Sequence, residues 1–227
     1  MSALSDSEKP WSARLQRGLA SLAIHLGEAQ QTLLIRYLAE FNKWNKTYNL
    51  SAIRDPEQMI SRHLLDSLSV VPWFQSAAGA SLRNIIDVGT GGGLPGIPLA
   101  IVFPERQFTL LDSNGKKTRF LFHIKTLLGL DNVTVENRRV EQFQPPVLFD
   151  AVISRAFASL EDMVQGSSSL LRDGGLFLAM KGIFPAEELL AVESRVCLEE
   201  SIPLVVPDSE GERHLLVLRS RAADSSP

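Results

Sequence analysis

A glycine-rich turn at residues 89–96 carries the strongest chemical signal in the sequence. An apolar run ending at Val88 leads directly into four glycines within five positions, and a helical pattern follows. Glycines let the backbone turn sharply, and they let a ligand approach the main chain where no Cβ blocks it. In an open parallel sheet such a turn lies at the carboxyl ends of the strands, where ligands bind. The turn therefore predicts a cofactor site.

Two cofactors use a turn of this kind, and nearby acidic residues help to separate them. A dinucleotide places its pyrophosphate on the helix N-terminus through a G-x-G-x-x-G spacing, which residues 91–96 satisfy. S-adenosylmethionine (SAM) carries no phosphate, and its binding sites usually have an acidic residue near the first glycine. Asp87, two residues before Gly89, fits this pattern. Asp112 ends the next predicted strand, from which a carboxylate reaches ribose hydroxyls in either cofactor. Asp87 therefore favours SAM, while NAD stays open.

The elements that must position this site follow an α/β pattern after the small-residue stretch 75–81. The pattern predicts strands at residues 84–88, 108–112, 133–136, 150–154 and 176–180. It predicts helices near residues 96–103, 115–129, 158–171 and 185–195. Strands that alternate with helices imply right-handed crossovers and a mostly parallel sheet covered on both faces.

The two last predicted strands break this alternation. Residues 201–206 and 214–219 are joined by a short polar stretch that leaves no room for a crossover helix, so the pair must be antiparallel. A mostly parallel, seven-stranded sheet that ends in an antiparallel hairpin is the Rossmann-like methyltransferase variant of the doubly wound α/β fold. We expect this fold here.

A helical segment precedes the α/β pattern. Leucines at positions 15, 19, 22 and 26 recur at helical spacing, and apolar residues at 33, 34, 37, 38, 41 and 44 do the same. Asp55 and Pro56 are a suitable cap and first residue for a further helix. We therefore expect a helical extension over residues 1–80 and a methyltransferase domain over residues 81–221.

Composition excludes several other classes of protein. The 227 residues contain 44% hydrophobic and 22% charged residues, which is typical of a folded, water-soluble chain. No apolar run reaches membrane-spanning length, and the N-terminus lacks the pattern of a signal peptide. The single cysteine, Cys197, cannot form an internal disulfide or a cysteine-based zinc site. We expect a cytoplasmic monomer without a metal site.

The charge is unevenly distributed along the chain. Residues 115–139 contain six basic and two acidic residues, whereas residues 183–212 contain eight acidic residues and one arginine. The net charge of −3 therefore hides a polarised molecule. The candidates for contacts with phosphate groups of a nucleic acid are Lys116, Arg119, Arg139, Arg155 and Lys181.

Five separate blocks of sequence resemble the RsmG (GidB) family. They are residues 44–50 (WNKTYNL), 62–67 (RHLLDS), 87–98 (DVGTGGGLPGIP), 110–113 (LLDS) and 154–158 (SRAFA), and the resemblance extends over roughly residues 30–219. Members of this family are SAM-dependent methyltransferases that modify N7 of one guanine in small-subunit (16S) ribosomal RNA. One departure is Gly92, where many relatives carry proline or another residue. We expect this glycine to loosen the loop.

The resemblance implies a set of site residues and a partner. It places cofactor contacts at Gly89, Leu94, Asp112, Val140, Glu141 and Arg155. The loop itself adds Asp87, Gly91 and Gly93 to the candidate cofactor-binding residues. The implied partner is small-subunit ribosomal RNA or a 30S-type ribosomal particle.

The residues after the fourth predicted strand agree with methylation of a ring nitrogen. Enzymes that methylate exocyclic amines typically have an Asn/Asp-Pro-Pro-aromatic block here, and those that methylate pyrimidine C5 need a cysteine nucleophile. This chain has Ser154-Arg155-Ala156-Phe157 instead, and its cysteine is distant in sequence. Guanine N7 bears no proton, so its methylation needs no general base. We expect catalysis by proximity and orientation, with no acid–base residue.

Other polar and aromatic residues have a structural interpretation. His63 and Asp66 could form an acid–base pair, but His63 lies on the apolar face of its helix, which favours a packed, hydrogen-bonded role. Phe157 could stack on a base, although core packing is favoured. Asn49, in a segment expected to fold over the cleft, could touch substrate or cofactor.

Three alternative functions stay open. An NAD-dependent oxidoreductase would share the loop and Asp112, but would have its loop near residue 10 and no terminal antiparallel hairpin. A methyltransferase of another RNA or a small molecule is the second; a small-molecule enzyme would need an apolar lid rather than a basic patch. The third is a non-catalytic RNA-binding module that kept a nucleotide pocket.

Overall fold

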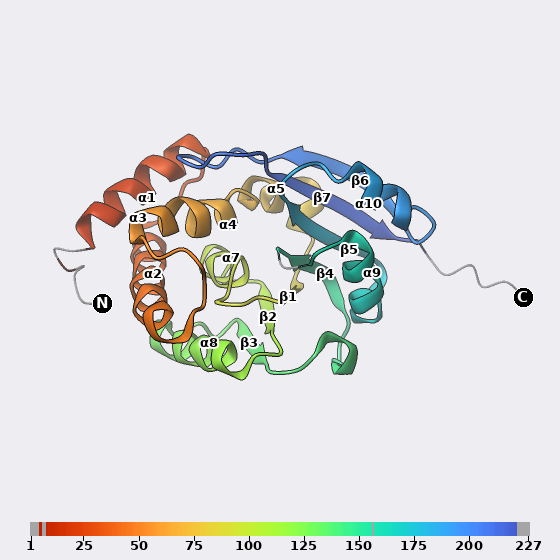
Figure 1. The fold of residues 1–227 in the computed structure, drawn as a ribbon, viewed down its shortest axis with the longest axis horizontal. Coiled ribbons are helices and arrows are strands. Elements are labelled where there is room, and N and C mark those ends of the chain that lie inside the picture. Colours follow the sequence, from red (N-terminus) through yellow and green to blue (C-terminus); the bar gives the residue numbers. More distant parts are fainter. Residues whose placement is uncertain (1–4, 6–7, 156, 222–227) are drawn as a thin grey trace, which may run out of the picture.

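A computed structural model describes residues 5, 8–155 and 157–221 (Figure 1). Its helices are α1 (Lys9–Ser21), α2 (Glu28–Tyr48), α3 (Pro56–Met59), α4 (Asp66–Leu68), α5 (Val71–Gln75), α6 (Ala77–Ala80), α7 (Gly96–Val102), α8 (Gly115–Leu128), α9 (Leu160–Ser167) and α10 (Ala186–Val192). A π-helical turn, η1 (Ile60–Leu65), joins α3 to α4, and η2 (Val140–Gln142) and η3 (Ser168–Leu170) are short 3₁₀ helices. The strands are β1 (Asn84–Val88), β2 (Gln107–Leu111), β3 (Val133–Glu136), β4 (Phe149–Ser154), β5 (Leu171–Lys181), β6 (Val196–Pro203) and β7 (His214–Ser220).

The seven strands form one mixed sheet in the order β3-β2-β1-β4-β5-β7-β6. Strands β1 to β5 pair in parallel, and β7 lies antiparallel between β5 and β6. The predicted fold class, a mostly parallel sheet that ends in an antiparallel hairpin, is confirmed. The chain reverses strand order between β1 and β4, and clefts form at such a switch point.

Helices cover both faces of the sheet, because the central strands are apolar on both sides. On β1, Ile85 packs into a core that also contains residues of α1, α2, α7 and α8, whereas Ile86 packs into a second core with α9. Figure 1 shows α2, α7 and α8 on one side of the strands and α9 and α10 on the other. The larger core therefore extends without interruption from the N-terminal helices into the sheet.

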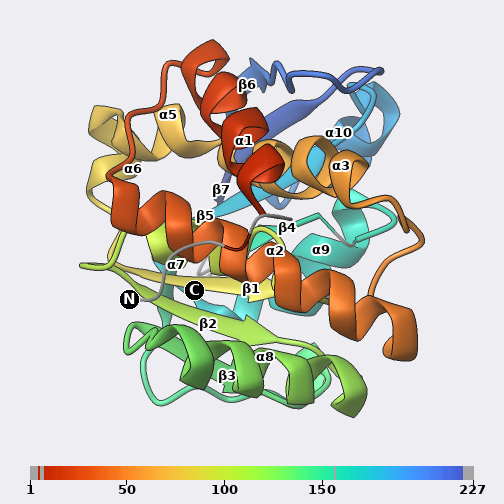
Figure 2. The same ribbon diagram turned by 90° about the vertical axis from the view of Figure 1, so that its left-hand side faces the viewer.

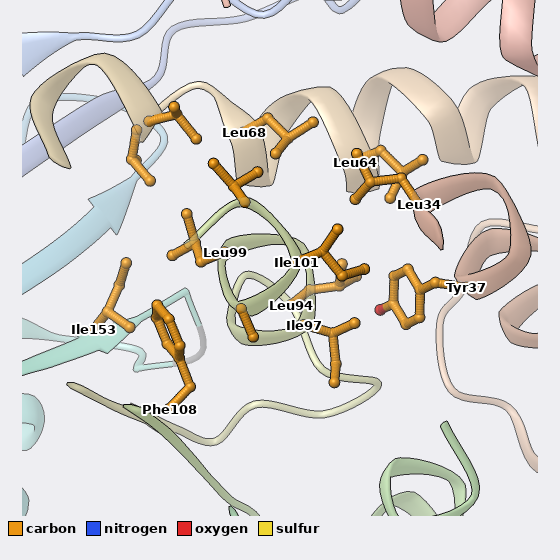
Figure 3. Close-up of a cluster of buried hydrophobic side chains, with 14 of the residues drawn as sticks. Leu34, Tyr37, Leu64, Leu68, Leu94, Ile97, Leu99, Ile101, Phe108 and Ile153 are labelled. Atoms are coloured by element: carbon orange, nitrogen blue, oxygen red, sulfur yellow. The ribbon is translucent and has the colours of Figure 1, made fainter. Parts of the chain in front are cut away.

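The N-terminal helices are held against α7 by buried apolar side chains. Figure 3 shows Leu34 and Tyr37 of α2, together with Leu64 and Leu68, around the side chains of α7. In Figure 2, α2 crosses in front of the sheet, and α8 lies below α2 in this view. Asp55 caps α3 as expected, since its carboxylate accepts a hydrogen bond from the backbone N–H of Glu57 at 3.0 Å.

Three predicted elements in the second half of the chain have the wrong boundaries. The helix predicted at residues 158–171 ends with α9 at Ser167, and β5 begins at Leu171, five residues before the predicted strand. The start of β5 was missed because Gly174, with a φ of +69°, interrupts the apolar strand pattern. In the structure, a hydrogen bond from Arg172 Nε to Asp150 Oδ1 (2.6 Å) joins this segment to β4. The strand predicted at 201–206 spans 196–203, because β6 is an edge strand whose exposed side chains lack an apolar alternation.

Candidate active site

A pocket of about 340 Å³ opens at the carboxyl ends of β1, β2 and β3. This is the edge of the sheet at which the glycine-rich turn predicts a cofactor. The pocket is lined by Val88, Gly89, Leu111, Asp112, Ser113, Lys117, Arg138, Arg139, Val140, Glu141 and Phe157. Four of the predicted cofactor residues thus share one pocket: Gly89, Asp112, Val140 and Glu141.

The turn after β1 depends on backbone conformations that glycine tolerates. Gly89 has a φ of +70° and Gly91 a φ of +61°, which residues with a Cβ rarely adopt. The N–H of Gly91 donates to Asp112 Oδ2 at 2.9 Å, and the N–H of Gly89 donates to the carbonyl of Leu111 at 2.9 Å. These bonds fix the turn against the end of β2, with Gly89 in the pocket wall.

Asp87 lies beneath the turn rather than in the pocket. Its side chain is fully buried, and Oδ2 accepts hydrogen bonds from Thr90 Oγ1 (2.6 Å) and from the N–H of Gly96 (2.9 Å). Oδ1 has no hydrogen-bond partner among the described residues. Burial raises the pKa of Asp87 to about 6, although the two hydrogen bonds and Arg155 act in the opposite direction. Asp87, expected as a cofactor contact, therefore has the geometry of a residue that positions the turn.

Gly93 and Leu94 also lie outside the pocket lining. A Cβ on Gly93 would stand 2.5 Å from Ile97 Cγ1 and 2.9 Å from Leu121 Cδ2, so this glycine allows α7 and α8 to pack closely. Leu94 is buried in the larger core. Both residues therefore support the turn from behind.

Gly92 does not loosen the turn, and the expectation that it would is corrected. A Cβ at this position would stand 2.3 Å from Phe41 Cε2, and Tyr37 Oη donates to the carbonyl of Gly92 at 2.7 Å. The missing side chain lets α2 pack directly on the turn. Tyr37 and Phe41 are thus supports of the site that sequence reasoning treated only as core residues of a helix.

The other wall of the pocket combines polar and apolar groups. Asp112 is 8% exposed, and its Oδ1 accepts from the N–H of Asn114 at 2.8 Å, while Lys117 Nζ lies 3.8 Å from Oδ2. Val140 and Glu141 come from η2, and Phe157 follows β4. A carboxylate at a strand end suits ribose hydroxyls, and the side chains of Val140 and Phe157 suit a purine ring. These residues fit an adenosine-containing cofactor such as SAM.

Arg155 belongs to a second pocket of about 240 Å³ beside the first. It was expected to contact cofactor and RNA, but it does not line the first pocket. Its Nη1 donates to Asp66 Oδ2 at 2.6 Å, and Arg213 Nε lies 3.3 Å from Asp66 Oδ1. The second pocket is lined by Ile53, Arg62, His63, Asp66, Arg155, Met180, Lys181, Gly182, Leu204 and Arg213. Neither Arg62 nor Arg213 was singled out from the sequence for a role in binding.

His63 has the packed, hydrogen-bonded role that the sequence favours. It is 4% exposed, its Nδ1–H donates to the carbonyl of Arg62 at 3.0 Å, and Nε2 therefore accepts from Ser51 Oγ at 2.9 Å. Burial, helped by the positive charge of Arg155, lowers the pKa of His63 to about 4. His63 is therefore neutral near pH 7 and pairs with no carboxylate in this geometry.

Asn49 ends helix α2. Its φ of +53° is left-handed, and its side-chain oxygen accepts a hydrogen bond from Arg54. Near it, the ring of Trp44 lies against the rings of Tyr48 and His123. Asn49 therefore acts as a helix cap in this structure, and it lines neither of the two pockets described above.

The predicted phosphate contacts lie in different settings. Lys116 and Arg119 are exposed on α8, and Arg139 is exposed at the rim of the first pocket. Lys181 Nζ lies 2.9 Å from Glu188 Oε2 and donates to the carbonyl of Ala158 at 3.2 Å, so its charge is partly compensated within the protein. Ala156, which belongs to the family block at 154–158, lies outside the described residues.

Comparison with known proteins identifies the family. Residues 30–216 match the family described as rRNA small subunit methyltransferase G. A ribosomal RNA small subunit methyltransferase G from Cellvibrio japonicus is 60% identical over 95% of this chain and 98% of that protein. A protein of the same name from Stutzerimonas stutzeri is 53% identical over 96% of this chain and 99% of its own length. The chain belongs to this family.

The fold agrees with that assignment. NodS, an N-methyltransferase from Bradyrhizobium japonicum solved with S-adenosylhomocysteine, superposes with a TM-score of 0.57 at 11% identity, over 80% of this chain and all of that one. The predicted family and the methyltransferase class are confirmed. The oxidoreductase alternative is not favoured.

Within residues 5, 8–155 and 157–221, no helix combines the length and apolar character needed to cross a membrane. The same part of the chain has no group of three or more His, Cys, Asp or Glu side chains that could hold a metal ion.

Proposed function

We propose that this chain transfers the methyl group of SAM to N7 of one guanine in small-subunit (16S) ribosomal RNA. The observation that carries the proposal is a pocket at the switch point of a methyltransferase sheet, in a chain that matches the ribosomal RNA enzymes over nearly its whole length. The choice of N7 comes from the family resemblance and agrees with the residues after β4.

In this proposal the first pocket binds the donor. Asp112 accepts hydrogen bonds from the ribose hydroxyls, Val140 and Phe157 flank the adenine ring, and Glu141 lies at the ring's polar edge. Gly89 brings main chain to the ligand where a Cβ would intrude. Bound SAM supplies an electrophilic methyl group on a positively charged sulfur.

The protein has no proton to move in this reaction. Guanine N7 is a hydrogen-bond acceptor with a lone pair, so it attacks without a general base. The chain contributes by holding N7 in line with the methyl group and by excluding other orientations, which can supply about 7–11 kcal/mol of a barrier. The neutral, buried His63 is consistent with chemistry that uses no acid–base residue.

The RNA is proposed to approach over the basic side of the molecule. Lys116 and Arg119 on α8 and Arg139 at the pocket rim are exposed and can contact backbone phosphates. The substrate is small-subunit RNA or a 30S-type particle, and we propose that the enzyme acts as a monomer in the cytoplasm.

The test uses the purified full chain with methyl-labelled SAM and small-subunit RNA from cells that lack this enzyme. Nucleoside analysis is expected to find the label in 7-methylguanosine at one site, and none in large-subunit RNA. Asp112→Asn is expected to raise the KM for SAM, while Asp131→Asn, at an exposed carboxyl group on a turn, serves as the matched control. Label in another nucleoside, or no transfer to RNA, would overturn the proposal.

A further inference from the structure

The side chains that line the second pocket carry an excess of positive charge. Four cationic side chains line it: Arg62, Arg155, Lys181 and Arg213. Among the residues that the structure describes, two carboxylates form ion pairs with them: Asp66 pairs with Arg155 and Arg213, and Glu188 pairs with Lys181. His63 adds no positive charge near pH 7, since burial keeps it neutral. The pocket therefore carries an excess of positive charge in a partly enclosed volume.

Asp66 holds two arginines in fixed positions. Its side chain is 9% exposed, and the guanidinium groups of Arg155 and Arg213 contact different oxygens of its carboxylate. The two side chains are themselves 24% and 29% exposed, so each keeps donors that face the pocket. A buried carboxylate that orients two guanidinium groups prepares them to bind an anion with little loss of side-chain entropy.

Arg62 completes this arrangement from the π-helical turn η1. Its side chain is exposed, and its guanidinium makes no hydrogen bond or ion pair with the part of the chain that the structure describes. An arginine that lines a pocket without a protein partner offers all five of its N–H donors to a ligand. The donor set is therefore that of a phosphate site.

The second pocket is next to the first because one segment contributes to both. Arg155 lines the second pocket and Phe157 lines the first, two residues apart after β4. The strand end is tied to the turn after β1, since Ser154 Oγ donates to the carbonyl of Val88 at 2.7 Å. An anion in the second pocket therefore lies beside the place where the donor's methyl group is presented.

We infer that the second pocket binds a backbone phosphate of the RNA next to the guanine to be methylated, with Arg62, Arg155 and Arg213 as its ligands. The inference rests on the proposed function, because it assigns a part of the RNA to a part of the same cleft. Phosphate contacts set register and orientation on a nucleic acid. Here the contact anchors the nucleotide so that N7 faces the first pocket.

The experiment compares Arg62→Gln and Arg213→Gln with Arg195→Gln. Arg195 is an exposed arginine next to the start of β6, at the opposite end of β7 from Arg213, so it is a matched loss of charge. Methylation of small-subunit RNA is measured against RNA concentration at several salt concentrations, and SAM binding is measured by calorimetry. Each pocket variant is expected to raise the KM for RNA about tenfold, as expected for one lost charge-assisted bond. The slope of log KM against log salt should fall by about 0.7 for each contact.

The outcomes separate this inference from the proposed function. SAM affinity is expected to stay within twofold of wild type in both pocket variants, and Arg213→Lys should recover part of the loss because it keeps the charge. If the pocket variants match Arg195→Gln while wild type methylates the RNA, the inference fails and the proposed function stands. If they lose SAM affinity, the pocket serves the donor instead. If wild type methylates no RNA, the proposed function itself has failed.

Discussion

Replacing Asp87 with asparagine should remove a pH-dependent part of the stability of the glycine turn. Burial raises the pKa of Asp87 from 3.8 to about 6, a change of about two units. One unit corresponds to about 1.36 kcal/mol, so the linked free energy is about 3 kcal/mol. The folded state binds the proton more tightly than the unfolded state. The stabilisation is therefore complete below about pH 4 and is lost as the pH rises through 6.

The assay is urea unfolding of wild type and Asp87→Asn at a series of pH values from 4 to 7.5. Tryptophan fluorescence monitors the unfolding transition. Asparagine keeps an oxygen that can accept from Thr90 and Gly96 but cannot ionise. The free energy of unfolding of the variant, minus that of wild type, should rise by about 2 kcal/mol between pH 4 and 7, most of the full linked free energy. Asp131→Asn is measured alongside as the same change at an exposed site. A difference that stays constant with pH would refute the role of burial at Asp87.

Three further variants test the site. Gly91→Val places a β-branched residue at a φ of +61°, so it should abolish SAM binding in calorimetry while circular dichroism still shows a folded chain; tight binding would refute the loop assignment. Gly92→Ala puts a Cβ 2.3 Å from Phe41 and should lower the free energy of unfolding by about 1–3 kcal/mol in urea titrations, whereas no loss would show that α2 shifts freely. Lys116→Glu combined with Arg119→Glu should weaken RNA methylation several-fold in filter assays with SAM affinity unchanged, and equal activity at moderate salt would remove this surface from RNA binding.

Much of the fold could be predicted because its signals are local. The apolar runs of β1 to β4 are bounded by turn residues, and the missing crossover before β7 requires an antiparallel pair. Edge strand β6 and the start of β5 were misplaced, since an exposed edge lacks apolar alternation and Gly174 interrupts the pattern. The division of the chain after residue 80 stays a prediction, and one core extends across it.

The sequence predicted which residues lie near the site more reliably than what each of them does there. Strand ends place Gly89, Asp112 and Val140 at one edge of the sheet, and parallel topology alone requires this. Whether Asp87 points into the pocket or beneath the turn depends on side-chain packing, which spacing does not encode. Arg213 reaches Asp66 across 147 positions of sequence, so no local pattern could join them. Arg155 was recognised, but its neighbours in the second pocket required the folded chain.

The most direct test of the account is a crystal structure of the protein with S-adenosylhomocysteine, the demethylated donor. The account predicts the ligand in the pocket at the ends of β1 to β3, with its ribose on Asp112, its adenine between Val140 and Phe157, and its sulfur directed toward Arg155. Density for the ligand anywhere else, or a pocket closed by these side chains in the complex, would contradict it.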